Sequence, residues 1–163
     1  MIDRYARDEM KSVWSEDNKY EKWLAVELAV CEAWAQVGVI PQKDMVKLRS
    51  AHHNTHRMDE IFQRTRHDMT AFTRSITESL GDEGRWIHLG LTSSDVLDTA
   101  QSLQLIDAAD LLLTQIDDLR AALKSRAIEF KDTLMMGRTH GIHAEPITFG
   151  LKLALWWDEM NRQ

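Results

Sequence analysis

The sequence contains few of the residues that interrupt regular secondary structure. Seven glycines and two prolines occur among 163 residues, which is too few for the many turns of a β-sandwich or β-barrel. The single cysteine, Cys31, cannot form a disulfide within the chain and lies in an apolar stretch, where a buried thiol is the ordinary interpretation. These shortages predict a helical protein in a reducing compartment.

The sequence also lacks the features of proteins that meet membranes or nucleic acids. No apolar run approaches the ~18 residues that cross a bilayer, and charged residues stand near the start, where a signal peptide is apolar. Twenty Lys and Arg residues against 26 Asp and Glu residues give a formal net charge of -6, with no basic stripe. We expect a cytoplasmic protein that binds neither a membrane nor nucleic acid.

Hydrophobic periodicity predicts helices along most of the chain. Residues 18–37 are apolar on nearly every side, which is typical of a helix buried in a core, and Gly38 ends it. Trp14, Trp23 and Trp34 stand at helical spacing and are predicted to belong to the core. Further helices are predicted for residues 41–51 with Pro41 as the first residue, for residues 58–80 with a break at 65–68, and from about residue 151.

The longest uninterrupted segment, residues 91–136, contains neither glycine nor proline. An apolar seam with spacings of three or four residues runs along it and comprises Leu105, Ala109, Leu112, Ile116, Leu119, Leu123, Ala127 and Phe130. A helix over residues 94–130 would be about 55 Å long, whereas a compact chain of this size is roughly 40 Å across. We expect other subunits, or sequence beyond residue 163, to cover the seam, and the missing helix stop signal at the end favours the second.

Polar residues of catalytic type gather in three segments where the periodicity lapses, namely residues 65–68, 86–95 and 137–146. In the second segment Thr92 or Ser93 would cap the long helix, with Asp95 at the capping-box position. The free amides of that first turn are suited to bind a carboxylate or a phosphate. The alternative, which this segment alone favours, is that the hydroxyls only cap the helix.

The third segment has a glycine on each side of Thr139 and His140, which gives the backbone freedom to approach a ligand. A histidine there can act as an acid or a base near neutral pH. His140, His143 and Glu145 could instead hold a metal ion, an alternative weakened by the absence of a thiolate or an HExxH helix. Arg138 has the alternative role of an ion pair that pins the loop.

The remaining histidines have equally ordinary interpretations. His67 beside Asp68 is either an oriented imidazole or a histidine satisfied by local hydrogen bonds at a helix break. His52, His53 and His56 lie in a polar connector, where solvated side chains are favoured over a metal site.

Five motifs distributed over essentially the whole chain carry a family resemblance. They are Arg4-Tyr5, residues 14–16 with 18–19, residues 65–68 with 71–74, residues 90–95, and residues 137–146 with 148–150. Together they resemble the N-terminal part of the adenylosuccinate lyase family, a branch of the fumarase/aspartase superfamily. The run at residues 137–146 is the most specific of the five.

The resemblance implies an all-α fold, with an N-terminal helical domain at residues 1–91 and the start of a central helical bundle at residues 92–163. It implies a homotetramer whose active sites are shared between subunits, which agrees with the uncovered seam. Members of the family eliminate fumarate from adenylosuccinate and from the succinylated carboxamide nucleotide SAICAR by general acid and base catalysis. We expect a nucleotide substrate, no cofactor and no metal ion.

The matched positions imply individual roles. His140 matches the general acid that protonates the departing purine nitrogen, and His67 matches a histidine that assists orientation. The other matches are Arg66 and Asp68 for substrate contact, Thr92 and Ser93 as donors to the aci-carboxylate, Thr139 beside the acid, Arg4 and Tyr5 at the nucleotide phosphate, and His88 as support near the site.

The catalytic base of the family is a serine on a glycine-rich loop, and no Gly-Ser-Ser-x-Met-Pro-like run occurs in this sequence. We therefore expect the 163-residue chain alone to be inactive. The alternatives are a helical oligomerisation module without catalysis, another lyase of the same superfamily, and a metal-binding helical protein.

Overall fold

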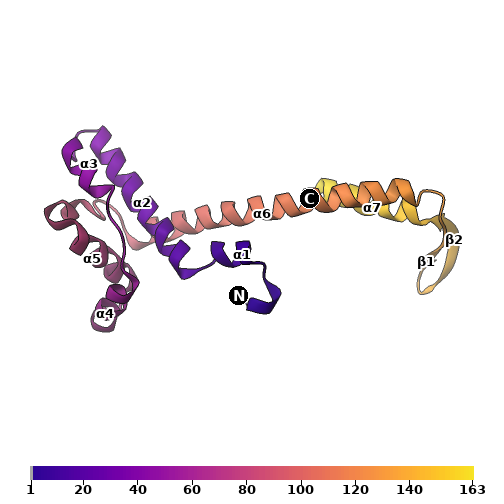
Figure 1. Ribbon diagram of the computed structural model, residues 1–163, viewed down its shortest axis with the longest axis horizontal. Coiled ribbons are helices and arrows are strands. Elements are labelled where there is room, and N and C mark those ends of the chain that lie inside the picture. The colour runs from indigo at the N-terminus through magenta and orange to yellow at the C-terminus, as the bar shows by residue number, and fades with distance from the viewer. Residues whose placement is uncertain (1) are drawn as a thin grey trace. The chain divides into compact units, whose positions relative to one another are not determined.

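The computed structural model describes residues 2–163, and Figure 1 shows the order of their elements. These are η1 Asp3–Tyr5, α1 Asp8–Val13, α2 Glu16–Gln36, α3 Gln42–Leu48, α4 Thr55–Thr65, α5 Asp68–Leu80, η2 Gly81–Trp86, α6 Ser93–Glu129, β1 Leu134–Thr139, β2 Ile142–Thr148 and α7 Phe149–Arg162. The chain divides into one compact unit that ends at Ala108 and a second that begins at Ala109, so α6 contributes to both. The predicted helical class is confirmed, while the domain boundary expected after residue 91 stays a prediction.

Most helix starts follow from a side chain that caps them. Ser15, Asn54 and Thr148 each accept a hydrogen bond from the amide three residues later, at the starts of α2, α4 and α7. The break predicted within the helical segment 58–80 is confirmed, because α4 ends at Thr65 and α5 begins at Asp68. These caps place the starts of α2, α4 and α7 two or three residues before the predicted starts at residues 18, 58 and 151.

Two predictions about helix starts and core residues need correction. Pro41 precedes α3 as its N-cap residue instead of opening the helix, and α3 ends at Leu48. Trp14 is 39% exposed and does not belong to the core, because α1 ends at Val13 and the buried face of that helix ends with it. The long helix, by contrast, is confirmed as Ser93–Glu129.

The core of the first unit contains side chains from α2, α5 and the start of α6. The ring of Trp23 meets the ring of Phe72 edge-on, with 5.2 Å between centroids, and Tyr20 meets Trp23 in the same way at 5.3 Å. Val96 and Ala100 on the first turns of α6 are fully buried in the same cluster. The core therefore holds the N-terminal end of α6 against the preceding helices.

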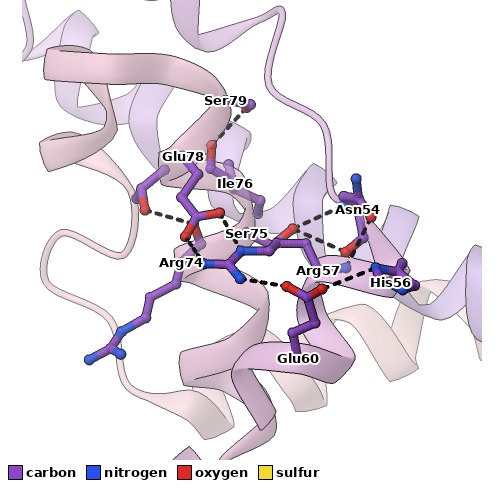
Figure 2. A network of polar contacts seen from close by, with 10 residues as sticks. Asn54, His56, Arg57, Glu60, Arg74, Ser75, Ile76, Glu78 and Ser79 are labelled. Carbon is purple, nitrogen blue, oxygen red and sulfur yellow. Dashed lines mark hydrogen bonds and ion pairs between the residues drawn. The ribbon is translucent and has the colours of Figure 1, made fainter. Parts of the chain in front are cut away.

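The two helices α4 and α5 are joined at the surface by one arginine and two carboxylates (Figure 2). Arg57 donates to both carboxylate oxygens of Glu78, at 2.7 and 2.8 Å, and to Glu60 at 2.6 Å. These hydrogen bonds lower the pKa of both carboxyl groups. At the start of α4 the amide of Asn54 donates to Ser75 Oγ on α5 at 2.9 Å. The helices on either side of the 65–68 segment are thus tied to each other.

The apolar seam predicted on the long helix is largely uncovered within this chain. Leu105, Leu112 and Leu119 are 52%, 55% and 47% exposed. Near the end of α6 a part of the seam is covered by α7, where the rings of Phe130 and Phe149 lie 5.4 Å apart. Among residues 2–163, no helix combines the length and the apolar character needed to cross a membrane.

The second unit contains a β-hairpin that the helical periodicity did not predict. Strands β1 and β2 pair antiparallel, and Thr139 is opposite Ile142, so His140 and Gly141 form a two-residue turn. Their φ angles of 52° and 74° are both positive, as a type I′ turn requires. The segment expected as a flexible bend is therefore the end of a hairpin.

The base of the hairpin is held where the backbones of α6 and α7 come close. Helix α7 runs back along the C-terminal part of α6 (Figure 1), and the amide of Gly150 donates to the carbonyl of Phe130 at 2.9 Å. A Cβ atom on residue 150 would collide with the carbonyl of Ala127 and with the backbone of Lys131. Only glycine fits this approach.

Candidate active site

The start of α6 is capped by a carboxylate from its own first turn. Both the amide and the hydroxyl of Thr92 donate to Asp95 Oδ2, at 2.7 and 2.9 Å. These hydrogen bonds, the backbone one first, lower the pKa of Asp95. Of the predicted capping box, the bond from the Thr92 amide to the Asp95 carboxylate is present. Ser93 is the first residue of the helix and is partly exposed. An arriving anion would meet helix amides and hydroxyls here, but the Thr92 hydroxyl must first leave Asp95.

Just before α6, His88 is held in an unusual backbone conformation by a buried carboxylate. Its φ of 66° lies in the left-handed region. The amide of His88 donates to Glu27 Oε2 at 2.8 Å, and ring atom Nδ1 lies 2.6 Å from Glu27 Oε1. The Glu27 side chain is completely buried, whereas the His88 side chain is 26% exposed. The second ring nitrogen, Nε2, is therefore the one available to a ligand.

Glu27 is a residue that sequence reasoning missed. It stands in the middle of a mostly apolar helix, four residues after Trp23 and four before Cys31, both of which are buried. This spacing places the carboxylate on the buried face of α2 and was the available signal. Its partner, 61 positions away, could not be read from the sequence.

His67 begins α5 and has the local hydrogen bonds that its ordinary interpretation requires. Its Nδ1 accepts from the amide of Thr70 at 3.2 Å, so in the neutral ring the proton lies on Nε2. Asp68 Oδ1 lies 3.7 Å from the same Nδ1 and accepts from the amide of Met69. Arg66 precedes them in the left-handed region, with φ 53°. Arg66, His67 and Asp68 are all exposed at the α4–α5 junction.

His140 and Thr139 lie at the exposed end of the hairpin in the second unit. Arg138 and His143 are opposite each other in the strand pairing. Within the part of the chain that the structure describes, Arg138 forms no ion pair, and no three His, Cys, Asp or Glu side chains gather where they could hold a metal ion. The end of the described hairpin thus offers an exposed acid-base group, His140, beside the exposed hydroxyl of Thr139.

The predicted phosphate ligands form a pair of their own near the start of the chain. The guanidinium of Arg4 lies 4.7 Å from the centre of the Tyr5 ring. Tyr5 is 74% exposed. Both side chains are available to an anion.

The predicted site residues therefore fall into four local groups. One contains His88, Thr92 and Asp95, which are close in sequence at the start of α6. The others are the 66–68 group, the Arg4-Tyr5 pair and the hairpin group. The first three belong to the first unit and the hairpin belongs to the second.

Solved structures of three enzymes are similar to this chain. The fumarate lyase of Mesorhizobium sp. BNC1 has a TM-score of 0.89 and 30% identity, over 96% of this chain and 38% of that one. The β-carboxy-cis,cis-muconate cycloisomerase of Acinetobacter calcoaceticus sp. ADP1 has a TM-score of 0.88 and 29% identity, over 96% and 38%. The 3-carboxy-cis,cis-muconate lactonizing enzyme of Pseudomonas putida has a TM-score of 0.89 and 26% identity, over 97% and 38%.

In sequence, the chain is 53% identical over 163 residues to the adenylosuccinate lyase of Bacillus subtilis (strain 168). The alignment covers 99% of this chain and 38% of that protein, so the chain spans well under half the length of its relative. A lyase family model matches residues 3–163. Because that match leaves only the first two residues outside it, the chain is a member of the lyase family.

Proposed function

We propose that this chain is the N-terminal part of an enzyme that eliminates fumarate from adenylosuccinate and from SAICAR, leaving AMP and AICAR. The observation that carries the proposal is the 53% identity, over nearly the whole chain, to an adenylosuccinate lyase. Similar structures with other names are only 30%, 29% and 26% identical. This difference favours the adenylosuccinate branch over another lyase of the same superfamily.

The start of α6 is suited to the first chemical step. Removal of a proton from the carbon beside a carboxylate creates an aci-carboxylate with two negative charges, which needs donors already in place. In the proposed reaction the hydroxyls of Thr92 and Ser93 and the first free amides of α6 supply them. The Thr92 hydroxyl exchanges Asp95 for the substrate carboxylate, while the Thr92 amide can keep its bond to Asp95.

The hairpin is suited to the second step. When the carbon–nitrogen bond breaks, the purine nitrogen must receive a proton, and His140 is the proposed general acid. Its position in a type I′ turn presents the ring at the end of two paired strands, with the Thr139 hydroxyl next to it. An acid on a paired hairpin is more firmly placed than one on an irregular loop.

The other matched residues are proposed to bind and orient the substrate. Neutral His67 carries its proton on Nε2 and can donate it to a substrate oxygen, with Arg66 and Asp68 beside it. The exposed guanidinium of Arg4 and phenol of Tyr5 share the phosphate oxygens. His88 supports the site beside Thr92.

We also propose that the complete enzyme is a cytoplasmic homotetramer with sites shared between subunits, acting on a nucleotide without a cofactor, a membrane or nucleic acid. The exposed leucines of α6 support the assembly, because a seam of this size in water favours association.

The proposal is tested by measuring fumarate release from adenylosuccinate by the full-length protein and, as a matched control, by residues 1–163 alone. We expect turnover by the full-length protein and none by the shorter chain, whose sequence contains no serine-bearing glycine-rich loop. A full-length protein that releases no fumarate contradicts the proposed activity. Turnover by residues 1–163 would contradict the expectation that this chain lacks the catalytic base.

A helical oligomerisation module is the alternative that a specific observation favours, namely the uncovered seam of α6. Under this alternative the polar segments are incidental. Replacement of His140 in the full-length protein would then leave any lyase activity unchanged, which separates the two proposals.

A further inference from the structure

One face of α2 holds the main chain of residues 86–90 through three side chains. Glu27 accepts from the amide of His88 at 2.8 Å. Cys31 Sγ contacts the carbonyl of Trp86 at 3.6 Å, and Trp34 Nε1 donates to the carbonyl of Leu89 at 3.0 Å. The three donors and acceptors stand at positions i, i+4 and i+7 of the helix and so share one side of it. Together they form what we call the α2 cradle: Glu27, Cys31 and Trp34.

The α2 cradle explains the backbone conformation of His88. A residue with a side chain is strained in the left-handed region and stays there only when its surroundings hold it. At His88 the amide is bound by a fully buried carboxylate, and the carbonyl of the next residue is bound by Trp34. Gly90, with φ 76°, completes the turn, and a Cβ there would lie 3.4 Å from the Trp34 ring.

The same carboxylate decides which ring nitrogen of His88 is available. Glu27 Oε2 accepts the amide hydrogen of His88, and in the ionised form of the carboxylate Oε1 can also only accept. The 2.6 Å contact between Oε1 and Nδ1 is then donated by Nδ1, whether the ring is neutral or charged. His67 is the opposite case, because its Nδ1 accepts from an amide.

We propose that Glu27 is a positioning residue, which fixes Nδ1 of His88 as a donor toward the protein and so leaves Nε2 as the atom that meets the substrate beside Thr92. This inference rests on the proposed function, which places the start of α6 in the reaction site. Glu27 is fully buried and acts only through His88. Its role resembles that of other carboxylates that orient a histidine ring by binding its second nitrogen.

The first test is a double-mutant cycle on the full-length protein, with fumarate release from adenylosuccinate as the readout. Glu27→Gln keeps the shape of the side chain but cannot accept from both the amide and Nδ1 of His88. We expect it to lower kcat/KM by roughly tenfold in the wild-type background, and by less than about twofold in the His88→Gln background. Equal losses in both backgrounds would show that Glu27 does not act through His88 and would overturn the proposal.

A matched control uses the same substitution elsewhere on the same helix. Glu32 is exposed and pairs with Arg49 at 3.1 Å. Glu32→Gln should leave kcat/KM unchanged within about twofold, because a surface pair contributes little. A loss as large as that of Glu27→Gln would mean that any charge change on α2 disturbs the site, and would count against the proposal.

The second test does not depend on activity or on a folded Glu27 variant. Solid-state NMR of full-length protein with isotope-labelled histidine, in which the His88 signal is identified by its loss in His88→Gln, reports the hydrogen on each ring nitrogen. Nδ1 of His88 should carry hydrogen at every pH at which the protein stays folded. A His88 Nδ1 that loses its hydrogen in that range overturns the inference. If the protein releases no fumarate but Nδ1 keeps its hydrogen, the proposed function fails while the orienting role of Glu27 remains.

Discussion

Two histidines of this chain share a left-handed backbone, and the two regions that hold them differ. His88, with φ 66°, is fixed by Glu27, a buried side chain 61 positions earlier in the sequence. His140, with φ 52°, belongs to a two-residue turn whose other member is Gly141. The first conformation depends on tertiary structure and the second on strand pairing next to it. The same backbone angle therefore responds to different substitutions in the two regions.

The largest effect is expected from His140→Ala in the full-length protein. Loss of the proposed general acid should reduce fumarate release by roughly a hundredfold or more. The thermal midpoint should hardly change, because the side chain is exposed at the end of the hairpin. A variant with full activity would show that the hairpin is structural and would support the oligomerisation alternative.

Glu27→Ala, unlike His140→Ala, is expected to lower the stability of the protein. Removing the carboxylate leaves the amide of His88 without its acceptor in a buried place, at a cost of about 2 kcal/mol in the free energy of unfolding. Thermal or urea unfolding of the full-length protein measures this loss. An unchanged midpoint would mean that the left-handed turn at His88 is stable without its partner.

A paired glycine substitution compares the two turns directly. Gly90 and Gly141 have φ angles of 76° and 74°, so an alanine at either position is strained by about 1 kcal/mol. At residue 90 the new Cβ also lies 3.4 Å from the Trp34 ring, whereas at residue 141 no atom lies within 4 Å. Gly90→Ala should therefore lower the thermal midpoint more than Gly141→Ala. Equal shifts would show that the α2 cradle adapts to the extra methyl group.

The smallest effect is expected at the start of α6 and depends on pH. The pKa of Asp95 is lowered from 3.8 by its bonds to Thr92, so the ionised carboxylate stabilises the fold. This contribution is complete above pH 3.8 and is lost as the pH falls through the lower folded value. The difference in thermal midpoint between wild type and Asp95→Asn should accordingly shrink on acidification. A difference in thermal midpoint that stays constant with pH would show that the Asp95 carboxylate does not stabilise the start of α6.

The sequence predicts well whatever local signals determine. Helix α6 begins one residue before its predicted start and ends one residue before its predicted end, because an unbroken run without glycine or proline has few alternatives. The break between α4 and α5 follows from His67 and Asp68, whose side chains bind the free amides of the next turn.

The features that the sequence did not show have either a weak local signal or a distant partner. The hairpin was missed because its turn is His140-Gly141, a weaker signal than Asn-Gly, and its strands show no clean alternation of buried and exposed residues. Glu27 was missed because a buried carboxylate is recognised only by the amide and ring it binds. Trp14 was misplaced because the helical spacing assumed with Trp23 and Trp34 ignores the end of α1 at Val13.

The close backbone contact at Gly150 lies outside the candidate site but affects the position of the hairpin. The space beside this residue is already filled by the carbonyl of Ala127 and the backbone of Lys131, so even one methyl group would act as a wedge between two helices. Strand β2 runs from the His140-Gly141 turn to Thr148, and α7, which contains Gly150, begins at the next residue. A larger residue at position 150 would therefore displace the end of β2 and, along that strand, the turn that holds His140, the proposed acid.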